Sequence, residues 1–224
     1  MHIGLIGGIG PASTELYYRA LVRSHLAAGK RLSLTIAHAD LGEMIANMEA
    51  GDAEAQAKIF SAHADRLKAA GCEAVALTSM GGHFCIAALR ELSSLPVISA
   101  VDAMDEYFRD KGARRVGVLG TQAVMDSGLY GVSSTEVIAP PPKVRPILHQ
   151  HYTAMARAGS ATPAARELFE TEAFKLFHEG GAEIIVLGGT DLFLAFDGRS
   201  YDFPVADCGL IHADAIARAS LAGG

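Results

Sequence analysis

A repeat with a spacing of 110 residues constrains the fold of this chain more than any other feature of its sequence. Each copy has a glycine suited to end a helix, then a short apolar run, then small residues. The copies read GCEAVALTS at 71–79 and GAEIIVLGG at 181–189. Two further pairs keep nearly the same spacing, IGLIG at 3–7 with VGVLG at 116–120 and PVI at 96–98 with PVA at 204–206. The chain is therefore predicted to consist of two related halves.

The apolar runs of the sequence are short, continuous and rich in β-branched residues, which is typical of parallel strands covered on both faces. They are Ile3–Ile6, Leu32–Ile36, Ala74–Leu77, Val97–Ile98, Val116–Leu119, Val137–Ile138 and Ile184–Leu187. Helical patterns lie between them. One begins at Asp52 and ends at Gly71, and another begins at Thr162-Pro163, a cap followed by a first-turn proline.

This alternation predicts an α/β fold of two pseudo-symmetric α/β/α lobes, each with a mostly parallel sheet, and a cleft between them. We expect the first lobe to comprise residues 1–97 plus 210–224, and the second to comprise residues 98–209. The prolines at 140–142 are expected to form a loop after a strand.

Composition excludes several classes of protein. Half of the 224 residues are hydrophobic, so a disordered chain is excluded. A net charge of −6 without a basic run argues against a nucleic-acid partner. The absence of a leader pattern and of a long apolar run predicts a cytoplasmic protein with no membrane partner. The three cysteines lack zinc-ligand spacing, which predicts free thiols and no metal site.

The segment GGIGPAST at 7–14 follows the first predicted strand and opens a helix. Backbone N–H groups of Gly8, Ile9 and Gly10 are therefore candidates to bind an anion at the positive end of that helix. No G-x-G-x-x-G motif is present, so a carboxylate is a better candidate than a dinucleotide. The alternative is a glycine turn that serves only close packing of strand and helix.

Polar residues follow both copies of the repeated strand, where ligands bind in open α/β sheets. Ser79 and His83 follow the first copy, and an imidazole suits proton transfer near neutral pH. Gly189, Thr190 and Asp191 follow the second copy. The alternatives are a capping or packing role for His83 and a helix first-turn role for Asp191. Cys85 is expected to be a small buried hydrophobe.

The sequence resembles the aspartate/glutamate racemase family. Members of this family use no cofactor, and their relatives act on hydantoins, maleate and arylmalonates. The resemblance covers nearly the whole chain. It rests on IGLIGG at 3–8 with Pro11 and Tyr17-Tyr18, on VGVLGT at 116–121, and on PVAD at 204–207 through IHA at 211–213.

The resemblance also identifies a substitution. Family members carry a Cys-Asn-Thr motif before the histidine that matches His83, and a Gly-Cys-Thr-Glu motif in the second half. Their two thiols flank the α-carbon of the substrate, and one removes a proton while the other returns one. Here Ser79-Met80-Gly81 and Gly188-Gly189-Thr190-Asp191 stand at these positions. Both cysteine positions are therefore expected to lack sulfur.

The resemblance implies which residues form the site. The candidates for acid/base or nucleophilic chemistry are Ser79, His83, Asp191 and His212. The candidates for substrate contact are Gly8, Ile9, Gly10, Met80, Gly81, Thr121, Arg157, Gly189 and Thr190. Of these, Arg157 aligns with a basic residue that some relatives use for the distal carboxylate.

The function expected from the sequence is that of a cofactor-independent, racemase-like isomerase acting on a small carboxylate or amino acid. Weak activity on aspartate and glutamate is expected, because a serine hydroxyl is far less acidic than a thiol and glycine has no side chain. The alternatives are a Ser79-dependent hydrolase or lyase, using Asp191 or Asp207 with His212, and a non-catalytic carboxylate-binding protein. The sequence leaves the substrate and the oligomeric state open, a homodimer included.

Overall fold

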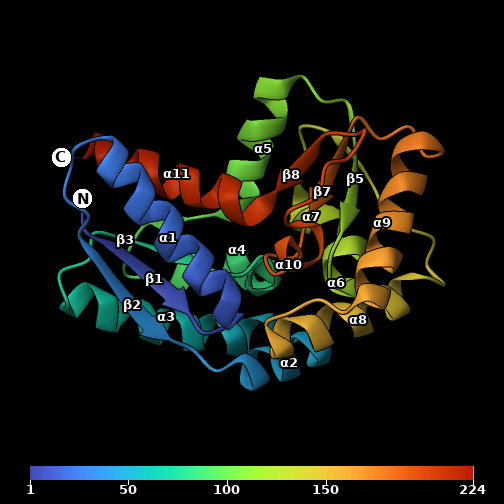
Figure 1. The fold of residues 1–224 in the computed structure, drawn as a ribbon. Coiled ribbons are helices and arrows are strands. Elements are labelled where there is room, and N and C mark those ends of the chain that lie inside the picture. Colours follow the sequence, from blue (N-terminus) through green and yellow to red (C-terminus); the bar gives the residue numbers. More distant parts are fainter. Residues whose placement is uncertain (224) are drawn as a thin grey trace. The chain divides into compact units, whose positions relative to one another are not determined.

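The computed structural model describes residues 1–223, which divide into two compact units. The first unit is Met1–Ala100 together with the chain from His212 onward, and the second unit is Val101–Ile211. Each unit contains one four-stranded sheet whose strands are all parallel. The predicted α/β fold of two lobes with parallel sheets is confirmed (Figure 1).

The first unit has the strand order β2-β1-β3-β4. Its strands are β1 (Ile3–Gly7), β2 (Leu34–His38), β3 (Ala74–Leu77) and β4 (Val97–Ile98). Its helices are α1 (Pro11–Ala27), α2 (Leu41–Ala50), α3 (Ala53–Ala69), the 3-10 helix η1 (Gly81–Cys85) and α4 (Ile86–Leu92), with most of α11 (Cys208–Ala222).

The second unit has the equivalent order β6-β5-β7-β8. Its strands are β5 (Arg115–Leu119), β6 (Glu136–Ile138), β7 (Ile184–Leu187) and β8 (Val205–Asp207). Its helices are α5 (Ala100–Lys111), α6 (Gln122–Asp126), α7 (Gly128–Gly131), α8 (Arg145–Ala158), α9 (Pro163–His178) and α10 (Phe193–Phe196). Strand β8 contains too few apolar residues to stand out as a run, but the PVA copy at 204–206 marks its position.

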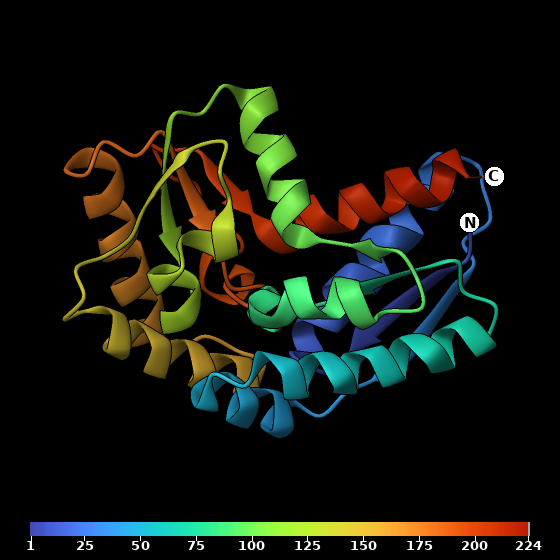
Figure 2. The ribbon, with the colours of Figure 1, turned by 180° about the vertical axis from the view of Figure 1, so that it is seen from behind.

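Two apolar cores cover the two faces of the first unit's sheet. Alternate residues of β1 point to opposite faces, as the pleat of a strand requires. Ile3 and Leu5 pack with α1 and α11, whereas Ile6 packs with α3 and α4. Helices α1 and α11 lie side by side in Figures 1 and 2, and the Met1 amino group donates a hydrogen bond to the carbonyl of Ser220.

A glycine in the middle strand of each unit shows how closely the two halves correspond. A Cβ atom on Gly4 would lie 2.9 Å from a side-chain atom of Leu67 on α3. A Cβ atom on Gly117 would lie 2.9 Å from the Cβ atom of Leu176 on α9. In both units, only glycine lets the helix that precedes the third strand approach the sheet this closely.

The predicted helix boundaries agree with the structure where capping residues specified them. Asp52 caps α3 by accepting a hydrogen bond from the Ala55 N–H, and Thr162 caps α9 through the Ala165 N–H. The triple proline forms part of the loop between β6 and α8, as expected.

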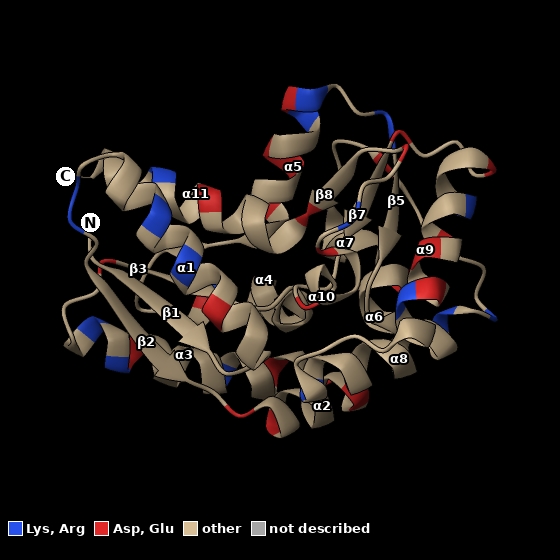
Figure 3. Cartoon of the chain, viewed as in Figure 1, with Lys and Arg blue, Asp and Glu red and all other residues tan. Residues whose placement is uncertain are grey.

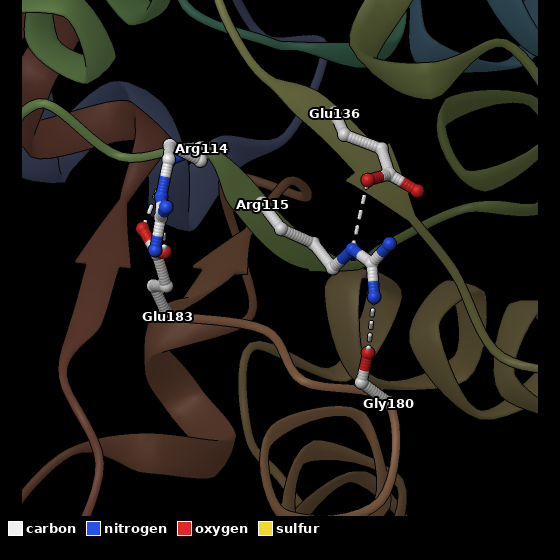
Figure 4. Close-up of polar contacts among 5 residues, drawn as sticks. All are labelled: Arg114, Arg115, Glu136, Gly180 and Glu183. Atoms are coloured by element: carbon white, nitrogen blue, oxygen red, sulfur yellow. Dashed lines mark hydrogen bonds and ion pairs between the residues drawn. The ribbon is translucent and has the colours of Figure 1, made fainter.

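Charged residues of both signs are scattered over the helices of each unit (Figure 3). Pairs one turn apart, such as Arg19 with Glu15 and Arg218 with Asp214, are exposed and contribute little stability. At the amino-terminal end of the second sheet, Arg115 bonds to Glu136 at 2.8 Å and Arg114 bonds to Glu183 at 3.2 Å (Figure 4). These contacts link the starts of β5, β6 and β7, so they help to fix the register of the strands.

Candidate functional site

Each unit has one topological switch point, a place where the connections from two neighbouring central strands run toward opposite edges of the sheet. In the first unit this point lies between β1 and β3, and in the second it lies between β5 and β7. Ligands bind outside the carboxyl ends of the strands at such points. The loops predicted to carry the site all begin at these four strand ends. The expectation that loops of the two halves meet in one cleft stays a prediction.

The loop after β1 opens helix α1 with two glycines that adopt positive φ, 86° at Gly8 and 118° at Gly10. The Gly8 N–H donates a hydrogen bond of 3.0 Å to the Thr14 hydroxyl. A Cβ atom on Gly8 would lie 2.3 Å from Nδ1 of His38, so the loop also needs glycine for packing. Ile9 belongs to the apolar core. The N–H of Gly8, a candidate for binding an anion, is thus already bonded to a side chain of α1.

The loop after β3 is buried throughout, including Ser79, Met80, Gly81 and His83. The His83 ring bonds through Nδ1 to the carbonyl of Ser79 at 2.8 Å, and its Nε2 accepts the Ala100 N–H at 3.0 Å. A nitrogen that accepts an N–H cannot itself carry a proton, so His83 is a neutral imidazole protonated at Nδ1. Both nitrogens are committed to the backbone.

His212 is buried beside His83, with ring centroids 5.7 Å apart. Its Nε2 bonds to the carbonyl of Ile98 at 2.9 Å, and its Nδ1 to the hydroxyl of Tyr17 at 3.0 Å. Burial, with a smaller effect of His83, lowers the pKa of His212 to about 3. His212 is therefore neutral at physiological pH and ties α11 to β4 and α1.

In the second unit, Gly189 lies against the ring of Tyr152, a residue of α8. A Cβ atom on Gly189 would lie 2.3 Å from Cε2 and 2.8 Å from Cζ of Tyr152. The Tyr152 hydroxyl donates a hydrogen bond of 3.1 Å to Oδ2 of Asp191. Burial, then the charge of Asp191, raises the pKa of Tyr152 well above its ordinary value. Sequence analysis missed Tyr152, and the only signal for it was the missing side chain at position 189.

Thr190 is 1% exposed, and its hydroxyl oxygen has no hydrogen-bond partner within the described residues. An unsatisfied buried hydroxyl costs about 1 to 3 kcal/mol, so such groups usually have a partner in the working protein. Thr121, the equivalent candidate at the end of β5, instead accepts the Val124 N–H and caps α6. The Thr190 hydroxyl is thus a buried polar group whose hydrogen-bonding capacity the described residues do not use.

Two carboxylates lie near this loop. Burial raises the pKa of Asp207 to about 6, and the charge of Asp191 adds to this effect, although N–H groups of Gly209 and Leu210 oppose it. Like charges that share a site favour the uptake of a proton. Arg157, the candidate for a distal carboxylate, lies exposed in the last turn of α8.

The cysteines of the chain are all buried and free. Burial is the main cause that raises the pKa of each thiol, to about 12 at Cys85 and well above the ordinary value at Cys208. A thiolate base is therefore not present at neutral pH. Within residues 1–223, no group of three or more His, Cys, Asp or Glu side chains could hold a metal ion.

The repeated sheets, with a polar loop at each switch point, define a class of two-lobed parallel α/β proteins. The family model of Asp/Glu/Hydantoin racemase matches residues 6–216. This chain belongs to that family.

Solved structures agree in fold. A protein from Yersinia pestis that has been assigned as an Asp/Glu racemase is 27% identical, with 99% of this chain and 100% of that chain covered and a TM-score of 0.85. An aspartate racemase homologue from Pyrococcus horikoshii OT3 is 24% identical, with coverage of 98% and 99% and a TM-score of 0.79. Glutamate racemase from Francisella tularensis subsp. tularensis SCHU S4, in complex with D-glutamate, is 16% identical, with coverage of 99% and 81% and a TM-score of 0.69.

Helices that could cross a membrane were sought in the described part of the chain. None is both long and apolar enough to do so.

Proposed function

We propose that this chain is a cofactor-independent isomerase that moves a proton at the α-carbon of a small carboxylate, as racemases do. Its family and the aspartate and glutamate racemases that share its fold support this class of reaction. The single observation that carries the proposal is the buried, unpartnered Thr190 hydroxyl at the end of β7. A substrate carboxylate would supply its missing hydrogen-bond partner.

Aspartate and glutamate are poor substrates under this proposal. The family motifs carry cysteines where this chain has Ser79 and Gly189. None of the chain's own cysteines can replace them as a base, because burial raises the pKa of all three. Met80 and Gly81, which replace Asn and Thr of the motif, leave that part of the pocket less polar and roomier. A substrate with an apolar group therefore fits better than a dicarboxylate.

The roles of the candidate residues follow from their hydrogen bonds. His83 and His212 act as positioning residues, since their ring nitrogens hold the Ser79 loop and the end of β4. Asp191 is therefore the remaining acid/base candidate, and its carboxylate is the group proposed to transfer a proton. Within the first unit, Gly8, Ile9 and Gly10 shape the loop after β1. Within the second unit, Thr121 and Gly189 shape the loops after β5 and β7, and Thr190 binds the substrate carboxylate.

A non-catalytic carboxylate-binding protein is the second candidate. One observation favours it, namely that the ring nitrogens of both candidate histidines, His83 and His212, are engaged in structural hydrogen bonds. The same observation disfavours a Ser79-dependent hydrolase or lyase, because the ring nitrogens of both candidate bases, His83 and His212, already bond to other groups.

The experiment that separates these functions is hydrogen exchange in deuterated water, followed by proton NMR. The substrates are the separate D and L enantiomers of aspartate, glutamate and phenylalanine and of their N-carbamoyl derivatives. An isomerase introduces deuterium at the α-carbon of at least one compound. Thermal stabilisation by a compound without exchange supports the binding protein instead. Neither exchange nor stabilisation with any compound refutes both.

A further inference from the structure

The ring of Tyr152 occupies the space that a side chain at position 189 would need. Position 189 is where the family motif carries its second cysteine. The Cβ of any residue there would come within 2.3 Å, 2.8 Å and 3.1 Å of three ring atoms of Tyr152. Real Cβ atoms essentially never approach another atom within 3.0 Å, so the two shorter distances exclude a side chain there unless the ring moves. Glycine at 189 and tyrosine at 152 therefore form a matched pair, and the loss of one side chain makes room for another.

The phenol group also brings a dissociable proton to this position. Its oxygen is one covalent bond beyond Cζ, the atom that lies 2.8 Å from the Cβ position of residue 189. Tyr152 is 8% exposed and Asp191 is 2% exposed, so their hydrogen bond is shielded from most of the solvent. A shielded hydroxyl and carboxylate in direct contact can pass a proton without competition from water.

We propose that Tyr152 and Asp191 together form the proton-transfer group of the second unit, in place of the side chain that Gly189 lacks. This inference rests on the function proposed above. Neither residue needs a thiol for this role. The pair could therefore serve a catalytic site that has no sulfur at position 189.

The step is a relay of two protons. The Cα–H bond of the substrate breaks, and its proton bonds to the Tyr152 oxygen. The proton that Tyr152 already carries moves to Oδ2 of Asp191, and the electron pair of the broken bond stays on the substrate and delocalises into its carboxylate. The reverse relay delivers a proton to the α-carbon. Tyr152 is neutral before and after the step.

Electrostatics around the pair agree with a relay. Burial raises the pKa of Tyr152, which disfavours a lasting phenolate and favours simultaneous loss and gain of a proton. Asp207 places a second carboxylate close enough for Asp191 to raise its pKa. Repulsion between the two carboxylates favours the arrival of one proton at the pair. Thr190, the neighbour of Asp191, can hold the substrate carboxylate during the step.

The test is deuterium exchange with the panel compound that the natural protein exchanges fastest, measured for each enantiomer separately. Tyr152→Phe keeps the ring against Gly189 and removes only the hydroxyl. A group that serves one face of the α-carbon matters for one enantiomer only. We expect exchange of one enantiomer, and racemisation, to fall about 100-fold, while exchange of the other stays within about threefold. Asp191→Asn, which removes the proton acceptor, should give the same asymmetry.

Tyr201→Phe is the matched control, since Tyr201 also lies in the second unit and donates a hydrogen bond to a carboxylate, that of Glu170. It should exchange both enantiomers as the natural protein does. Circular dichroism and thermal unfolding establish that each variant is folded.

The outcomes separate the two proposals. If the natural protein exchanges a compound and Tyr152→Phe changes both enantiomers equally, or neither, Tyr152 is structural and this inference is wrong while the isomerase remains. Should Tyr152→Phe not fold, Asp191→Asn decides by the same criterion. If the natural protein exchanges no compound, the proposed isomerase is refuted and this inference with it.

Discussion

Replacing Gly189 by alanine should destabilise the protein through one contact, and the structure gives the size of the effect. The added Cβ would lie 2.3 Å from Cε2 of Tyr152, where ordinary carbon contacts begin at about 3.5 Å. The ring must therefore move by about 1 Å inside a buried helix contact, and overpacking of this kind costs about 1 to 3 kcal/mol or more. We expect a loss near the upper figure, about 3 kcal/mol.

A double-mutant cycle isolates that contact. Tyr152→Ala removes the ring and leaves space for the new Cβ, at its own cost of about 3 to 5 kcal/mol. In this background Gly189→Ala should be nearly neutral, because Gly189 does not need a positive φ and alanine reduces the entropy of the unfolded chain. The expected coupling energy between the two positions is therefore about 3 kcal/mol.

Urea unfolding monitored by circular dichroism measures each free energy of unfolding. Gly81→Ala serves as the matched control in the other polar loop, since its Cβ would meet its nearest neighbour, Oγ of Ser79, at 3.5 Å. Its effect should stay below about 1 kcal/mol. The reasoning is refuted if Gly189→Ala costs no more than the control, or if its cost is the same with and without the Tyr152 ring.

Three further predictions concern pH and activity. The folded protein raises the pKa of Asp207 from 3.8 to about 6, so its unfolding free energy should fall as pH rises from 4 to 6. In Asp207→Asn, the amide oxygen can still accept both backbone N–H groups. This variant should be more stable than the natural protein by about 2 kcal/mol at pH 7 and equally stable near pH 4. A pH-independent difference in the free energy of urea unfolding would contradict this. The natural protein should racemise aspartate and glutamate at far below about 1 per second, and polarimetry showing an ordinary turnover would overturn that expectation. The double variant Ser79→Cys with Gly189→Cys should gain little α-deuterium exchange on aspartate. Adding Tyr152→Ala makes room for the second sulfur, so the triple variant should exchange faster. Equal exchange by the double and triple variants would argue against the steric conflict.

The strand and helix pattern could be read from the sequence because it depends on local properties. Strands buried on both faces need continuous apolar residues, and helix ends need capping groups such as Asp52 and Thr162. The repeat with its 110-residue spacing then predicted two similar halves, and the two sheets have the equivalent strand order. The short strand β8 was less clear, since its two apolar residues form no run.

The candidate site itself stays a prediction, but the sequence could indicate which strand ends carry it. Strand ends at a switch point place Ser79 and Gly189 without any knowledge of side-chain contacts. Whether a histidine there can transfer a proton depends on its hydrogen bonds, and these come from distant parts of the chain. His83 accepts the N–H of Ala100, and His212 bonds to Tyr17, which lies 195 residues away in sequence.

The sequence by itself therefore determined the fold class, the repeat and the family resemblance, and the two altered motifs stay a prediction from that resemblance. Only the tertiary structure decided that both imidazoles are held by structural hydrogen bonds and that Tyr152 fills the space beside Gly189. The physical reason is the range of the interactions. Hydrophobic patterning and capping act over a few residues, whereas the packing of a ring against a glycine 37 positions away exists only once the helix has docked beside the strand end.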